Sequence, residues 1–198
     1  MNSDQFFWEN GYCTVTDFLP DAYYMSILPE NMYSEGHMQW SYDGSDLEVH
    51  KEELQVSGTF SRHCFPPYRS YHQYAKDVVQ RVIRPPHLLY PTYYFDRIYY
   101  TGSELVPHID WEPCEISVTV QLESTLLKPW SFYIETLKGE EKKVDLYNGG
   151  AIIYMGDKCK HWREPMGGGK KDYHHQLFLH YVVKDGECFN VLKSKGHM

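Results

Sequence analysis

Residues 99–110, which read YYTGSELVPHID, are the stretch around which the rest of the chain is organised. Near its end, His108 and Asp110 stand two positions apart. Side chains alternate between the two faces of an extended strand, so these two would point the same way and could bind one metal ion. A histidine from a distant strand would complete two imidazoles and one carboxylate, the set that suits non-haem Fe(II) and leaves coordination positions open.

The bulk properties of the 198-residue chain favour one domain with its own core. A formal net charge of -8 offers no general attraction to nucleic acid, which argues against a nucleic-acid partner. Five cysteines without a Cys-x-x-Cys pair fit neither a disulfide framework nor a zinc ribbon, and favour a reducing compartment. The sequence has no signal-peptide-like start and no apolar stretch long enough for a membrane span. We expect a cytoplasmic protein without membrane contact, and the oligomeric state stays open.

The first part of the chain, residues 1–87, is predicted to be a helical and loop region that supports the core. Residues 11–15 read as a short strand, and 22–32 as a helix that a proline cuts or bends. Residues 34–59 are polar and contain three glycines, which predicts loops and a candidate lid. Residues 68–84 carry apolar side chains at helical spacing up to a pair of prolines, and give the clearest helix in the sequence.

After these prolines, residues 88–185 have the texture of a strand-rich core, followed by a tail at 186–198. The predicted strands are 93–100, 115–122, 130–136, 143–146, 150–155 and 176–183. Short strands bounded by turn residues are typical of a sandwich or barrel rather than of alternating strands and helices. We therefore predict a mainly β fold with N-terminal helices: a double-stranded β-helix, or cupin-like jelly roll, with supporting α-helices.

A second motif lies at residues 161–171, HWREPMGGGKK. It resembles the distal motif of prolyl-4-hydroxylase-like 2-oxoglutarate/Fe(II) dioxygenases, in which the distal histidine ligand is followed by proline at +4, an apolar residue at +5, glycine at +8 and a basic residue at +10. Counting from His161, the four positions hold Pro165, Met166, Gly169 and Lys171.

The proximal stretch resembles the same family. Relative to His108, it places Tyr99 at -9, Gly102 at -6 and Pro107 at -1, as the family does, before Asp110 at +2. Two separate motifs thus agree in order and spacing. The resemblance covers roughly residues 91–183, and residues 10–19 are similar to the strand that opens many such domains.

The resemblance implies an active site with His108, Asp110 and His161 as the catalytic metal ligands. It also implies Fe(II) as the metal, 2-oxoglutarate as cosubstrate and O2 as oxidant, with ascorbate as a candidate auxiliary reductant. The predicted reaction hydroxylates an aliphatic C–H and forms succinate and CO2.

For the cosubstrate, the resemblance assigns the remote carboxylate of 2-oxoglutarate to Lys171 and a phenolic hydrogen bond to Tyr99. Arg163 lies two residues beyond His161 and would share its face, so it is a candidate for binding substrate or cosubstrate; the alternative is a surface ion pair with Glu164. Nucleic-acid demethylases of the superfamily have an arginine here and a second one six residues later. That later position is Leu177, which argues against a demethylase.

Several neighbouring residues are weaker candidates. Arg97 shares strand parity with Tyr99 and could line the pocket or form a salt bridge, while Ser117 and Thr119 could touch 2-oxoglutarate. Three later histidines have no carboxylate at ligand spacing, and we interpret them as packing or surface residues: His174, His175 and His180.

No motif in the sequence identifies the substrate. The branch favours a prolyl or other amino-acid side chain in a peptide or protein, and a free amino acid or small metabolite is the alternative. A different class of function is a non-catalytic cupin-like module that holds a metal or ligand. A closed structural metal site usually has four ligands, whereas only three are found here at convincing spacing.

Overall fold

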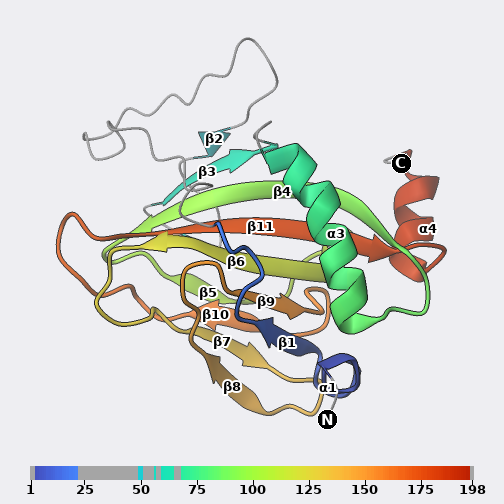
Figure 1. The fold of residues 1–198 in the computed structure, drawn as a ribbon, viewed down its shortest axis with the longest axis horizontal. Coiled ribbons are helices and arrows are strands. Elements are labelled where there is room, and N and C mark those ends of the chain that lie inside the picture. Colours follow the sequence, from blue (N-terminus) through green and yellow to red (C-terminus); the bar gives the residue numbers. More distant parts are fainter. Residues whose placement is uncertain (1–2, 22–48, 51–55, 57–58, 65–67, 197–198) are drawn as a thin grey trace.

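The computed structural model describes residues 3–21, 49–50, 56, 59–64 and 68–196. In these residues, two antiparallel sheets pack together, with α-helices at the outside (Figure 1). The larger sheet has the order β1-β9-β6-β11-β4-β3-β2, from β1 (Tyr12–Val15), β2 (Val49–His50), β3 (Thr59–His63), β4 (Leu89–Tyr100), β6 (Ile116–Ser124), β9 (Ala151–Tyr154) and β11 (Tyr173–Val183). The smaller sheet has the order β5-β10-β7-β8, from β5 (Leu105–His108), β7 (Phe132–Glu135), β8 (Glu141–Val144) and β10 (His161–Arg163).

From β4 onwards, the chain passes back and forth between the two sheets. β4, β6, β9 and β11 lie in the larger sheet, and β5, β7, β8 and β10 in the smaller one. This winding is a double-stranded β-helix, so the predicted fold class is confirmed. Each predicted core strand is present, although β11 begins three residues earlier than expected and β8 is shifted towards the N-terminus.

Helix α3 (Arg69–Ile83) covers the outer face of the larger sheet (Figure 1). It buries His72, Ala75, Val79 and Ile83, which recur every three or four residues and so form one stripe along the helix. The helix ends at Arg84, which has a left-handed backbone (φ 44°) and whose N–H donates to the carbonyl of Gln80. The prediction of a helix at 68–84 is therefore confirmed.

Strand β11 is buried along its whole length because both of its faces are covered. On the outer face, the Tyr181 hydroxyl donates to the carbonyl of His72 in α3 at 3.1 Å. On the inner face, Gln176, Phe178 and His180 line a pocket between the two sheets. This complete burial follows from the central position of the strand between β6 and β4.

Two parts of the chain differ from the sequence prediction. The tail expected at 186–198 contains α4 (Glu187–Ser194), which buries Cys188, Phe189 and Leu192 beside Val182. The N-terminus contains α1 (Ser3–Asn10), which was not predicted. Both helices have only eight residues, so tertiary packing rather than intrinsic propensity holds them.

The helix predicted at 22–32 lies outside the described residues. So does most of the region 34–59, including the candidate lid; only 49–50, 56 and 59 of it are described. Among the described helices, none has the length and apolar character that crossing a membrane requires.

Candidate metal centre and adjoining pocket

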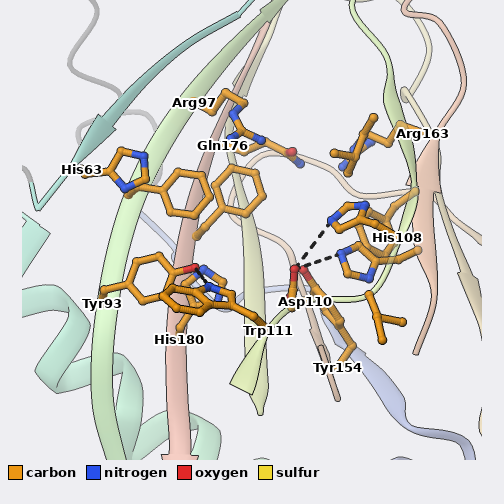
Figure 2. Close-up of a pocket in the computed structure, with 16 residues that line it drawn as sticks. His63, Tyr93, Arg97, His108, Asp110, Trp111, Tyr154, Arg163, Gln176 and His180 are labelled. Atoms are coloured by element: carbon orange, nitrogen blue, oxygen red, sulfur yellow. Dashed lines mark hydrogen bonds and ion pairs between the residues drawn. The ribbon is translucent and has the colours of Figure 1, made fainter. Parts of the chain in front are cut away.

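Two short strands bring the three predicted metal ligands together. His108 ends β5 and pairs directly with His161, the first residue of β10. Asp110 follows two residues later, and its Oδ1 lies 3.6 Å from the Nε2 of each histidine (Figure 2). The potential ligand atoms of the three residues all lie within 4.8 Å of one another. Such a cluster can hold one metal ion through two imidazoles and one carboxylate.

Backbone carbonyls orient both imidazoles. Nδ1 of His108 donates to the carbonyl of Val106 at 2.8 Å, and Nδ1 of His161 donates to the carbonyl of Cys159 at 2.9 Å. Because Nδ1 carries the proton in each ring, Nε2 is free to be a ligand. Burial also lowers the pKa of His161 to about 4, so at neutral pH its Nε2 carries a lone pair.

Asp110 is fixed through its second oxygen and its backbone. The hydroxyl of Ser117 donates to Oδ2 at 2.8 Å, and the Asp110 N–H donates to the carbonyl of Gly156 at 2.8 Å. A Cβ on Gly156 would lie 2.3 Å from Oδ2 of Asp110 and 2.5 Å from the carbonyl oxygen of Cys114, so this close approach requires glycine. Burial alone would raise the pKa of Asp110, but its two imidazole neighbours and the hydrogen bond from Ser117 hold that pKa well below its usual range.

A pocket of about 390 Å³ adjoins the three ligands. Figure 2 shows aromatic rings on the side opposite Asp110. Tyr93 and Phe95 of β4 lie beside Phe178 and His180 of β11, with interplanar angles of 11° for Phe95 and Phe178 and 23° for Tyr93 and His180. The exposed indole of Trp111 donates to the Tyr93 hydroxyl at 3.3 Å. We call Tyr93, Phe95, Phe178 and His180 the aromatic wall.

A third side of the pocket is polar, and Arg163 dominates it. Its guanidinium lies 4.7 Å from the ring centroid of Trp130 and 5.3 Å from that of Phe132, and it donates through Nη1 to the carbonyl of Trp130. Burial lowers the pKa of Arg163 only to about 10, so it stays charged at neutral pH. Within the described residues it has no ion pair, and the ion pair with Glu164 considered from the sequence is not formed.

The predicted cosubstrate residues are distributed differently from expectation. Lys171 is exposed in the turn before β11 and is not among the residues that line the pocket. Tyr99 is fully buried, packs edge-on against Trp130 at 4.9 Å, and accepts a hydrogen bond from Arg97 at 3.3 Å. The structure therefore places Arg163 and Tyr99 around Trp130 and leaves Lys171 at the surface.

The weaker candidates also have defined places. Arg97 lines the pocket, as the sequence allowed. Ser117 supports Asp110, and the Thr119 hydroxyl lies 3.4 Å from that of Tyr154; neither serine nor threonine is among the lining residues.

From the sequence, His174 was interpreted as a packing or surface residue, and Gln176 was not considered. Both are fully buried on the inner face of β11. Within the described residues, neither ring nitrogen of His174 and neither amide atom of Gln176 has a hydrogen-bond partner. Their shared parity with Phe178 was the available signal, but it has meaning only once β11 is known to be central.

Solved structures with the same fold include 2-oxoglutarate/Fe(II) oxygenases. A prolyl-4-hydroxylase from Pseudomonas putida is 13% identical, with a TM-score of 0.66, 92% of this chain and 97% of that chain being covered. A prolyl hydroxylase from Trichoplax adhaerens, in complex with a hypoxia-inducible-factor peptide fragment, is 13% identical with a TM-score of 0.66, covering 96% and 90%.

HygX from Streptomyces hygroscopicus, with nickel, 2-oxoglutarate and hygromycin B bound, is 10% identical with a TM-score of 0.64, covering 91% and 86%. No protein-family model matches the chain, and no curated protein matches its sequence. At these identities the likeness concerns the fold. The chain has the fold of the 2-oxoglutarate/Fe(II) oxygenases, which confirms at that level the resemblance seen in its two motifs.

Proposed function

We propose that this protein is an Fe(II)- and 2-oxoglutarate-dependent dioxygenase that hydroxylates an aliphatic C–H. The observation that carries the proposal is the cluster of His108, Asp110 and His161 at the edge of a pocket. Its donor set fits Fe(II), because two imidazole nitrogens and one carboxylate oxygen occupy one side of the ion and leave the other side for reactants. The orientation of both Nε2 atoms by backbone carbonyls supports the same assignment.

The residues around the pocket have different roles, according to the side on which they lie. When bound, Fe(II) with 2-oxoglutarate and O2 would supply the oxidation, in which the cosubstrate becomes succinate and CO2 and the substrate C–H becomes C–OH. His108, Asp110 and His161 hold the metal, and Ser117 keeps the carboxylate of Asp110 in place. The polar side of the pocket holds the cosubstrate, and the aromatic wall orients the substrate and excludes water from the metal.

For the substrate, we favour an uncharged aliphatic side chain of a peptide, with proline as the first candidate. Among the described lining residues Asp110 is the one carboxylate, so a cationic substrate would have no partner once the metal is bound. The aromatic wall suits an apolar ring. A second groove of about 420 Å³ shares Tyr93 and Trp111 with the pocket and continues along Pro91 and Pro113, which supports an extended substrate.

A small-molecule substrate is the second candidate. The fold neighbours include one determined with a peptide fragment and one determined with hygromycin B.

A cytoplasmic location is also part of the proposal, and it is supported by the free state of all five cysteines.

The test is succinate formation from 2-oxoglutarate with added Fe(II) under air, with and without peptides that contain proline. We expect turnover in the wild type and turnover at the protein-free level in His161→Ala. The control is His87→Ala, which changes an exposed histidine outside the pocket and should have wild-type turnover. A wild type that binds metal but forms no succinate with any substrate would favour the cupin-like binding module instead.

A further inference from the structure

We infer that the remote carboxylate of 2-oxoglutarate is bound by Arg163 of β10, with His174 and Gln176 of β11 completing the site, and that Lys171 takes no part. This inference rests on the proposed function, because it names the residues that recognise the cosubstrate. It departs from the resemblance in the sequence, which assigns the carboxylate to a lysine ten residues after the distal histidine.

The guanidinium of Arg163 has the donors that a carboxylate needs. Only 2% of this residue is exposed, and Nη1 is committed to the carbonyl of Trp130. Nε and Nη2 are enclosed and have no hydrogen-bond partner within the described residues. These two nitrogens lie on the same edge of the guanidinium, and this edge forms the parallel pair of hydrogen bonds to a carboxylate. A buried charge without a counterion is costly, so an anionic ligand at this edge would be strongly favoured.

His174 and Gln176 supply further donors on the facing strand. They lie two residues apart on the inner face of β11, where each has enclosed polar atoms without a partner. Gln176 lines the pocket, whereas His174 does not line it and instead packs edge-on against Trp130 at 5.4 Å, the same indole that Arg163 covers. A neutral imidazole and a side-chain amide each offer an N–H to an anion. The ligand would satisfy polar atoms on both strands together.

The position of Arg163 along β10 suits the length of the cosubstrate. His161 and Arg163 are both buried while Trp162 between them is half-buried, as expected when residues 161 and 163 share the inner face. Two residues span about 7 Å along a strand. A five-carbon 2-oxo diacid that chelates a metal at His161 can therefore reach Arg163 with its other end.

The other two cations considered for this role are placed less well. Lys171 is exposed and does not line the pocket. Arg97 lines it, but its Nε donates to the Ser61 hydroxyl at 2.8 Å and its Nη1 to Tyr99 at 3.3 Å. This leaves Arg163 as the cation in the described part of the pocket whose bidentate edge is uncommitted.

The experiment compares two ligands on protein loaded with Ni(II), using calorimetry rather than turnover. One ligand is 2-oxoglutarate, and the other is 2-oxopentanoate, which has the same five-carbon chain but no remote carboxylate. We expect the wild type to prefer 2-oxoglutarate by on the order of 100-fold. Arg163→Met should reduce that preference to a few-fold, whereas Lys171→Met, the matched control, should keep the wild-type preference.

Thermal unfolding of each variant shows whether it is folded, and Arg163→Lys, which keeps the charge but loses the fork, should give an intermediate preference. A wild-type preference in both arginine variants, or its loss in Lys171→Met, overturns the inference. A wild type that binds Ni(II) but does not distinguish the ligands overturns it while leaving the metal centre intact. A wild type that binds no divalent metal overturns the proposed function, and this inference with it.

Discussion

The two ends of the pocket differ in how completely the protein satisfies its own polar groups. At the metal end, the Nδ1 atoms of His108 and His161 and the second oxygen of Asp110 all have protein partners. The other end is where we place the remote carboxylate of 2-oxoglutarate, and we call it the carboxylate end. There, Arg163 and His174 have enclosed nitrogens without partners in the described part of the chain. The metal end is thus held in shape by the protein alone, whereas the carboxylate end has polar groups that only a ligand would satisfy.

The largest effect is expected from removing a protein partner at the metal end. Ser117→Ala deletes the donor to Asp110 but leaves all three metal ligands unsubstituted, and we expect the affinity for Ni(II) to fall by about 10- to 100-fold. Titration against a competing chelator measures this loss. Thr119→Val is the matched control, since the Thr119 hydroxyl contacts only Tyr154, at 3.4 Å, among the hydrogen bonds found for it. Equal affinities in both variants would show that the metal end is not held in place by Ser117.

The metal end and the carboxylate end also differ in how much of each could be predicted from the sequence. His108 and Asp110 are two residues apart, so their meeting follows from strand geometry, and His161 is marked by its own motif. The fold was predictable for a related reason, because strand-like stretches follow one another after the two prolines, and several of them are bounded by turn residues.

At the carboxylate end, the spacing of two residues predicted that Arg163 shares a face with His161. Which residues of β11 lie across the pocket from Arg163 is not encoded by any spacing along the chain. Lys171 matched the family position by count, yet the turn before β11 places it at the surface. The helix α4 was missed because its eight residues are stabilised by burying Phe189 and Leu192, which is tertiary packing rather than local sequence.

A smaller effect is expected at the carboxylate end, where replacing His174 should raise the stability of the protein but lower its affinity for 2-oxoglutarate. His174→Leu removes a buried group without partners, so the free energy of unfolding of ligand-free protein should rise by about 1 kcal/mol. The affinity for 2-oxoglutarate should fall by about fivefold, because one donor is lost. Urea unfolding and calorimetry measure the two quantities, and the affinity for 2-oxopentanoate should not change. A loss of stability in this variant would mean that His174 is satisfied by the protein, and the contrast between the two ends would fail.

The smallest effect tests whether His174 is buried as a neutral ring. Burial lowers its pKa well below 6.5, the ordinary value, which it regains in the unfolded chain. Since the folded state disfavours the proton, stability has its full value above pH 6.5 and falls as the pH falls, because the unfolded chain takes up a proton that the folded protein does not. Between pH 7 and pH 6 this one group should account for about 0.7 kcal/mol of lost stability.

Between pH 7 and pH 6, His174→Leu should therefore lose about 0.7 kcal/mol less free energy of unfolding than the wild type does. Urea unfolding of ligand-free protein at both pH values measures this difference. His87→Leu, which changes an exposed histidine, should behave as the wild type. If the wild type and His174→Leu lost equal stability, His174 would take up its proton as readily in the folded state as in the unfolded one. Below pH 6.5 it would then add a positive charge to that of Arg163, with which it interacts electrostatically, and in that range the carboxylate end would require an anion more strongly than its unpaired donors indicate.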